Sequence, residues 1–245
     1  MFSRLLFWKR ESQDAMSAEQ HKRPGMLSDF ILGSQDGIVN VLGVILGVAI
    51  ASMDFTIILA GGLAATFAES ISMGAVAYTT TLARRDHYLG ERTREMKEMA
   101  DLPHIEREEV RQILEGWDFH GQELEDLTDR IVTKPKAWLE IMMAHELNLS
   151  PIEEGQPLKS SLLVFSAAII GSLLPLIPFV IARHEILWGI VASLVVSAFA
   201  LFLIGWYKAK VTVGRPGRSG LQMTAIGVAS AVAGFGIAYL VDVLL

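Results

Sequence analysis

Five long runs with almost no charge constrain this chain more than any other feature of its sequence. They cover residues 27–53, 55–83, 160–182, 186–207 and 219–241. Each run is long enough to cross the hydrocarbon core of a bilayer as an α-helix. The composition agrees, because 51% of the residues are hydrophobic and the mean hydropathy is +0.40, which is high for a soluble domain. The sequence therefore predicts an all-α polytopic membrane protein with five transmembrane helices.

A polar segment separates the second run from the third. Residues 84–157 hold 18 of the 27 acidic residues and 10 of the 21 basic residues, a net charge of about −8 by this count. This balance favours cations as partners and argues against nucleic acid. We expect a tail at 1–27, two spans within 28–83, a helical insert at 84–158 and three spans within 159–245.

The basic residues outside the insert predict the orientation in the membrane. They gather in the N-terminal tail, at Arg4, Lys9, Arg10, Lys22 and Arg23, and between the last two runs, at Lys208, Lys210, Arg215 and Arg218. Because short loops rich in Lys and Arg stay in the cytoplasm, we expect the N-terminus and the insert inside and the C-terminus outside. The compact chain favours a prokaryotic cell membrane, or a vacuolar membrane if the source is eukaryotic.

Two carboxylates interrupt the first two runs. Asp36 shares a helix face with Asn40, and Glu69 shares one with Met73. Ionisable groups are costly in hydrocarbon and by default suggest an ion or proton pathway. We therefore predict that Asp36, Asn40, Glu69 and Met73 line a transport path. The alternative is a structural polar stripe that holds helices together.

The insert offers three pairs of metal-ligating side chains, each pair on one helix face. They are Glu95 with Glu98, Glu106 with Glu109, and Met142 with Glu146. Carboxylate oxygens suit Mn²⁺ and Fe²⁺, and a thioether favours softer ions. The insert is therefore predicted to be a metal-binding domain. In the alternative interpretation, these acids form exposed ion pairs such as Arg94 with Glu98, and Met142 fills a core.

Several function classes lack the residues that they need. The chain has no cysteine, which excludes disulfides and thiolate sites. His145 and Glu146 begin a zinc-protease pattern, but Leu149 stands where its second histidine belongs. No phosphate-binding loop of the ATPase type is present. We expect no enzymatic activity and no resident cofactor, and energy drawn from an ion gradient.

Several short segments together resemble the vacuolar iron transporter family. They are Gln35-Asp36-Gly37, Ser72-Met73-Gly74 leading to Arg85-Asp86, the acidic insert, and Leu173-Leu174-Pro175-Leu176-Ile177-Pro178. The resemblance covers about residues 28–244. It implies a homodimer of five-span subunits that moves Fe²⁺, and often Mn²⁺, out of the cytoplasm in exchange for protons.

The resemblance also implies roles for individual residues. Asp36 and Met73 would line the ion path near the dimer interface, and the cytoplasmic domain would bind metal through Glu95, Glu98, Glu106, Glu109, Met142 and Glu146. One position departs from the family pattern. Many members have an acid one turn after the second-span methionine, where this chain has Ala77, and this chain instead has Glu69 one turn before that methionine.

These observations together predict a proton-coupled exporter of divalent metal. Two alternatives use the same residues differently. A passive divalent-cation channel would move metal without counter-protons. A membrane-anchored metal buffer or sensor would bind ions without transporting them. Helices that serve only as an anchor do not need carboxylates within the membrane, where such groups are costly.

Overall fold

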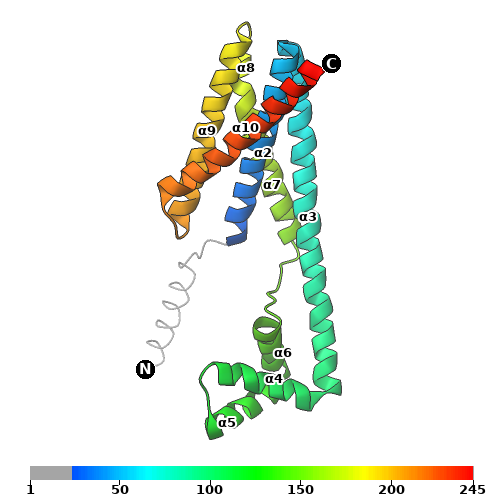
Figure 1. Cartoon of the computed structure of the whole chain (residues 1–245). Coiled ribbons are helices and arrows are strands. Elements are labelled where there is room, and N and C mark those ends of the chain that lie inside the picture. The colour runs from blue at the N-terminus through cyan, green and yellow to red at the C-terminus, as the bar shows by residue number, and fades with distance from the viewer. Residues whose placement is uncertain (1–23, 245) are drawn as a thin grey trace, which may run out of the picture. The chain divides into compact units, whose positions relative to one another are not determined.

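The structure, a computed structural model, describes residues 24–244, so most of the predicted N-terminal tail lies outside the described residues. Within that range the chain is helical and contains no strand. The described residues divide into two compact units, one made of residues 24–74 and 162–244, and one made of residues 75–161 (Figure 1). The prediction of an all-α fold is confirmed.

The first unit contains the membrane spans. Five helical segments are long and apolar enough to cross a bilayer, which confirms the predicted number. They are α2 (Pro24–Ser52), the first part of α3 (Phe55–Asp101), α7 with α8 (Gln156–Leu173 and Ile177–Ile181), α9 (Ile186–Val211) and α10 (Pro216–Leu244). Helix α2 packs against both α9 and α10. The protein is therefore an integral, multi-pass membrane protein.

Two prolines, Pro175 and Pro178, interrupt the third span. Helix α7 ends at Leu173, a single 3-10 turn covers Leu174–Leu176, and α8 continues from Ile177. Proline removes a backbone donor and crowds the preceding turn, which leaves carbonyl groups without helical partners. At this break the Ser193 hydroxyl of α9 donates a hydrogen bond of 2.8 Å to the carbonyl oxygen of Pro175.

Glycines allow α2 to approach its neighbours closely. A Cβ atom placed at Gly33 or Gly37 would lie 2.5 Å from a backbone carbonyl oxygen of α7, that of Val164 or Ala168 respectively. On another side of α2, a Cβ at Gly234 of α10 would lie 2.5 Å from the carbonyl oxygen of Gly43. This backbone contact is what the GxxxG spacing of the first span predicts.

The second unit is built on the far part of α3. This helix runs without interruption from the membrane span to Asp101, so the boundary expected near Arg84 falls inside a helix. Leu102 ends it, and Pro103 occupies the first turn of α4 (Pro103–Gly116), where a missing backbone donor costs nothing. Helices α5 (Gly121–Val132) and α6 (Pro135–Ile141) complete the unit around a core of Val110, Leu114, Leu124, Trp138 and Met142.

A substitution at Gly37 tests the close packing of α2 on α7. In Gly37→Ala the added methyl group meets backbone, which cannot move aside as a flexible side chain can, so we expect a loss of roughly 1–3 kcal/mol in unfolding free energy. Thermal unfolding in detergent measures it. The control is Gly90→Ala in α3, where a Cβ meets nothing within 4 Å. An equal effect of the two substitutions would contradict this account of the packing.

Candidate metal-binding and transport sites

Three of the predicted metal-ligating glutamates converge in the second unit. Glu95, Glu106 and Glu146 each place a carboxylate oxygen within 4.8 Å of the other two. Two oxygens on opposite sides of one ion, each about 2.2 Å from it, would lie about 4.4 Å apart. Small side-chain rotations would therefore suffice for one divalent cation to be shared by all three.

Three separate elements position these carboxylates. Glu95 lies near the end of α3, and Glu106 lies in the first turn of α4 after the break at Leu102. Glu146 ends a π-helical segment, Met142–Glu146, that directly continues α6. A π-turn inserts one extra residue into a helix and is often found at functional sites. This turn sets the direction of Glu146 relative to α6.

Burial disfavours the ionised form of the carboxyl groups in this cluster. The side chains of Glu95 and Glu106 are 1% and 4% exposed. Among the described residues, Oε1 of Glu95 and Oε2 of Glu106 have no hydrogen-bond partner. Buried acceptors without a donor are costly, and buried like charges more so. The cluster therefore requires protons or a cation to be stable.

Protonation removes the negative charge of a buried carboxylate, and the pKa values of Glu106 and Glu146 are raised accordingly. Burial is the main cause that raises the pKa of Glu106, followed by a hydrogen bond to Glu95 and by the charges of Glu95, Glu109 and Glu146. Burial also raises the pKa of Glu146 to about 7, with added repulsion from Glu109, Glu95 and Glu98. These carboxyls therefore exchange protons near neutral pH.

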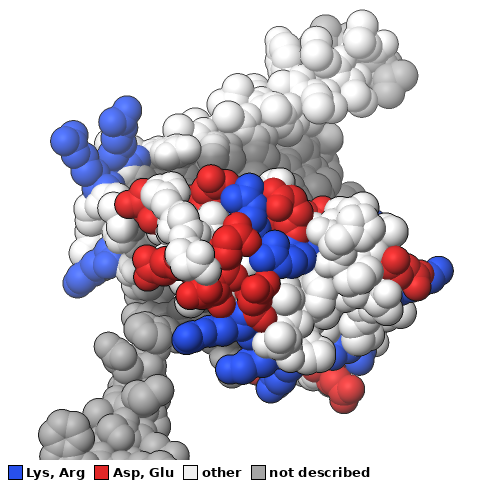
Figure 2. Space-filling view, turned by 90° about the horizontal axis from the view of Figure 1, so that it is seen from below, with Lys and Arg blue, Asp and Glu red and all other residues white. Residues whose placement is uncertain are grey.

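The remaining two glutamates of the prediction lie at the edge of this cluster. Glu109 is half-buried, and its pKa is raised by burial and by the charges of Glu95 and Glu98. Glu98 instead pairs with Arg94 over 3.6 Å, and Arg94 also pairs with Glu91 over 2.8 Å. Acidic side chains gather on the face of the molecule seen in Figure 2, with Lys and Arg beside them. The alternative of solvated ion pairs thus describes Glu98, whereas Glu95 and Glu106 point inward.

Met142 is fully buried and belongs to the hydrophobic core of the second unit. It begins the π-turn that ends at Glu146. Met142 therefore fills the core, as one interpretation of the sequence predicts. It also precedes Glu146 of the cluster by one turn, so its role as a metal ligand stays a prediction. The π-turn itself carries no sequence signal that we recognise, and its position was not predicted.

The membrane unit brings the predicted path residues of α2 and α3 together. The amide of Asn40 donates a hydrogen bond to Oε1 of Glu69, and the carboxyl groups of Asp36 and Glu69 are close enough to interact directly. Met73 lies one turn after Glu69 on the same helix face and is half-buried. Asp36 lies about 18 Å along α2 from Pro24, and Glu69 about 21 Å along α3 from Phe55. Both carboxylates therefore lie deep within their spans.

This polar group is not enclosed by the described part of the chain. Asn40 is exposed, and Asp36 and Glu69 are half-buried. Polar atoms that face hydrocarbon at this depth cost several kcal/mol unless protein or water satisfies them. The face that carries them therefore requires a polar cover, such as another protein surface or a water-filled passage.

Comparison with known proteins points to one family. The profile of the VIT family matches residues 27–239. The chain is 32% identical over 225 residues to vacuolar iron transporter 1 of Arabidopsis thaliana, which covers 91% of this chain and 90% of the relative. A vacuolar iron transporter of Centaurea cyanus is 33% identical over 224 residues, 90% of each chain. A vacuolar iron transporter of Plasmodium falciparum is 26% identical over 219 residues, 85% of this chain and 80% of the relative.

The family profile spans all five membrane helices as well as the insert that carries the carboxylate cluster. The identity to the plant relatives extends over almost the whole of both proteins. By its fold and by these comparisons, the chain belongs to the VIT family and is an integral membrane protein of metal transport.

Proposed function

We propose that this protein exports Fe²⁺, and Mn²⁺ or related divalent cations, from the cytoplasm in exchange for protons. The observation that carries the proposal is the group of Asp36, Asn40 and Glu69 deep within two membrane spans. Carboxylates at this depth are costly and are typically found on ion or proton pathways. The relatives named as vacuolar iron transporters support iron as the cargo.

Exchange would follow from competition for one set of oxygens. A divalent cation binds the ionised carboxylates of Asp36 and Glu69, and the thioether of Met73 adds a softer ligand. Protons that arrive from the other side neutralise the same oxygens and release the metal. Glu69 thereby takes the role of the acid that many family members have at the position of Ala77. No resident cofactor is needed, because the metal is the cargo.

The insert would collect metal on the cytoplasmic side. Its cluster of Glu95, Glu106 and Glu146 combines closely spaced oxygens with buried acceptors that lack a donor. Glu98, Glu109 and Met142 surround or support this cluster in the proposed metal site. An ion bound there removes the repulsion between the carboxylates, and protonation weakens the binding.

We further propose that the protein acts as a homodimer whose two copies cover each other's polar face. The support is the exposure of Asn40 and the partial exposure of Asp36 and Glu69 within their membrane spans. A second copy would satisfy these groups and enclose a path between the subunits. We place the N-terminus in the cytoplasm and the C-terminus outside because of the basic links, and we expect a prokaryotic cell membrane.

Neutral isosteres of the membrane acids test the transport path. In Asp36→Asn and Glu69→Gln the side chains keep their shape but cannot ionise, so we expect metal uptake into proteoliposomes to fall by at least about tenfold. Metal binding at the insert should be unchanged. Glu185→Gln, in the link before α9, is the matched control and should transport normally. Full transport by both acid variants would refute this assignment.

Substitution in the insert tests the proposed metal site. Glu106→Gln removes one buried oxygen anion from the cluster, so we expect Mn²⁺ affinity, measured by titration calorimetry on the full-length protein, to fall about 10–100-fold. Glu140→Gln on α6 is the control, because Glu140 is exposed and lies outside the cluster, with an ion pair to Lys136 over 3.9 Å. Equal affinities in the two variants would remove the cluster from consideration as a metal site.

The raised pKa values predict how metal binding depends on pH. The pKa of Glu146 is about 7, and that of Glu106 is also raised, so both carboxyls gain protons as the pH falls through neutrality. Metal must then displace those protons, and the affinity of the insert for Mn²⁺ should fall steeply between about pH 8 and pH 6. Glu106→Gln should flatten this dependence. An affinity that stays constant over the same range would contradict the proposed competition.

A further inference from the structure

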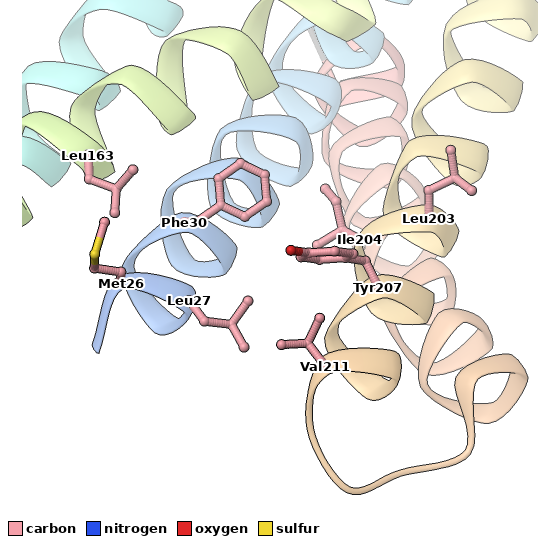
Figure 3. A pocket seen from close by; sticks show the side chains of 8 residues that line it. All are labelled: Met26, Leu27, Phe30, Leu163, Leu203, Ile204, Tyr207 and Val211. Atoms are coloured by element: carbon pink, nitrogen blue, oxygen red, sulfur yellow. The ribbon is translucent and has the colours of Figure 1, made fainter. Parts of the chain in front are cut away.

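A large apolar groove opens in the membrane unit away from the acids described above. Its volume is about 650 Å³, within the range of roughly 300–1,000 Å³ typical of ligand pockets. Figure 3 shows the residues that line it, which come from the start of α2, from α7 and from the end of α9: Met26, Leu27, Phe30, Leu163, Leu203, Ile204, Tyr207 and Val211. Tyr207 supplies the single hydroxyl of this lining, and its ring points into the groove. Such a lining favours an apolar molecule or the apolar part of a larger one.

A second, more polar pocket adjoins the groove. It has a volume of about 360 Å³ and shares Leu27 with the groove. Its lining adds Ser28, Gln35, Lys208 and Thr212, together with apolar residues of α2. Asp29, on the same turn of α2 as Ser28, lines neither pocket. An apolar space thus continues into a smaller space that offers one cation and several hydrogen-bonding groups.

The end of α9 beside these pockets has the features of a membrane boundary. Trp206 and Tyr207 precede Lys208 and Lys210, and the ammonium group of Lys210 lies 4.8 Å from the centre of the Trp206 ring. Aromatic rings of this kind are enriched at the level of lipid headgroups. Lys208 and Lys210 are both exposed, so two positive charges lie beside these pockets at the end of α9.

We propose that the two pockets together bind one anionic phospholipid. An acyl chain occupies the apolar groove, and the phosphate lies beside Lys208 with Ser28, Gln35 and Thr212 as hydrogen-bonding neighbours. Basic pockets between membrane helices bind anionic headgroups in this way. We expect an anionic phospholipid to bind more tightly than a zwitterionic one. The headgroup of a zwitterionic lipid also carries an ammonium group, which Lys208 and Lys210 would repel. The inference is independent of the ion that the protein transports.

Native mass spectrometry of the full-length protein tests this proposal. The protein is purified in mild detergent and mixed with phosphatidylglycerol or phosphatidylcholine of identical acyl chains. We expect phosphatidylglycerol to be retained at least about fivefold more often, the ratio that about 1 kcal/mol per basic residue corresponds to. Lys208→Gln should abolish this preference, whereas Lys136→Gln, an exposed lysine of the second unit, should preserve it.

A second variant tests the apolar groove separately. Leu203→Trp adds bulk to the lining, so both lipids should be retained less, while the oligomeric state measured in the same spectra should match that of the unmodified protein. Equal retention of the two lipids by the unmodified protein would mean unspecific annular lipid and would overturn the proposal. The proposal would also be overturned if Lys208→Gln and Leu203→Trp both retained the two lipids as the unmodified protein does. The groove would then be filled by another part of the protein or by a second copy.

Discussion

The cost of holding carboxylates in a poorly solvated environment is the constraint on which this structure depends. It acts in two places, once between α2 and α3 within the membrane spans and once between α3, α4 and the π-turn after α6. In each place the charged groups of at least two acids face one another, and neighbouring side chains supply too few donors to stabilise all of them as anions. Either protons or a divalent cation can remove the repulsion. This choice is the physical basis of the exchange that we propose.

The rest of the fold keeps these groups in place. Glycines along α2 let its backbone touch α7 and α10, which fixes the helix that carries Asp36 and Asn40. At the proline break of the third span, a hydroxyl of α9 donates a hydrogen bond to the carbonyl oxygen of Pro175 and so links the two spans. In the insert, a core around Val110 and Met142 holds α4 and the π-turn together, so that Glu106 and Glu146 remain near Glu95.

Much of this architecture is predictable from the sequence, for identifiable reasons. Span number and the proline kink follow from residues that act locally, through hydropathy and through the missing donor of proline. The spacing of three and four residues predicts that Glu95, Glu106 and Glu146 each belong to a ligand pair on one helix face, but it does not predict the π-turn that directs Glu146. Their roles as ligands stay predictions, as do those of the membrane acids.

Other features depend on contacts between distant segments and carry no local signal. The hydrogen bond from Asn40 to Glu69 requires the register of α2 against α3, which neither helix specifies alone. Glu95 is buried whereas Glu98 pairs with Arg94 at the surface, and this difference depends on how α4 packs against α3. The change from apolar to charged residues near Arg84 indicates where the chain leaves the membrane, but it does not interrupt α3, because both compositions favour helix.

Counting both ions in one experiment tests the central claim most directly. The purified protein is placed in liposomes, a pH gradient is imposed, and Fe²⁺ or Mn²⁺ uptake is followed together with a pH-sensitive dye on the opposite side. Exchange predicts metal flux that increases with the gradient and is accompanied by proton flux in the opposite direction. Metal flux indifferent to the gradient, or metal binding without flux, would contradict it and would favour a channel or a metal buffer respectively.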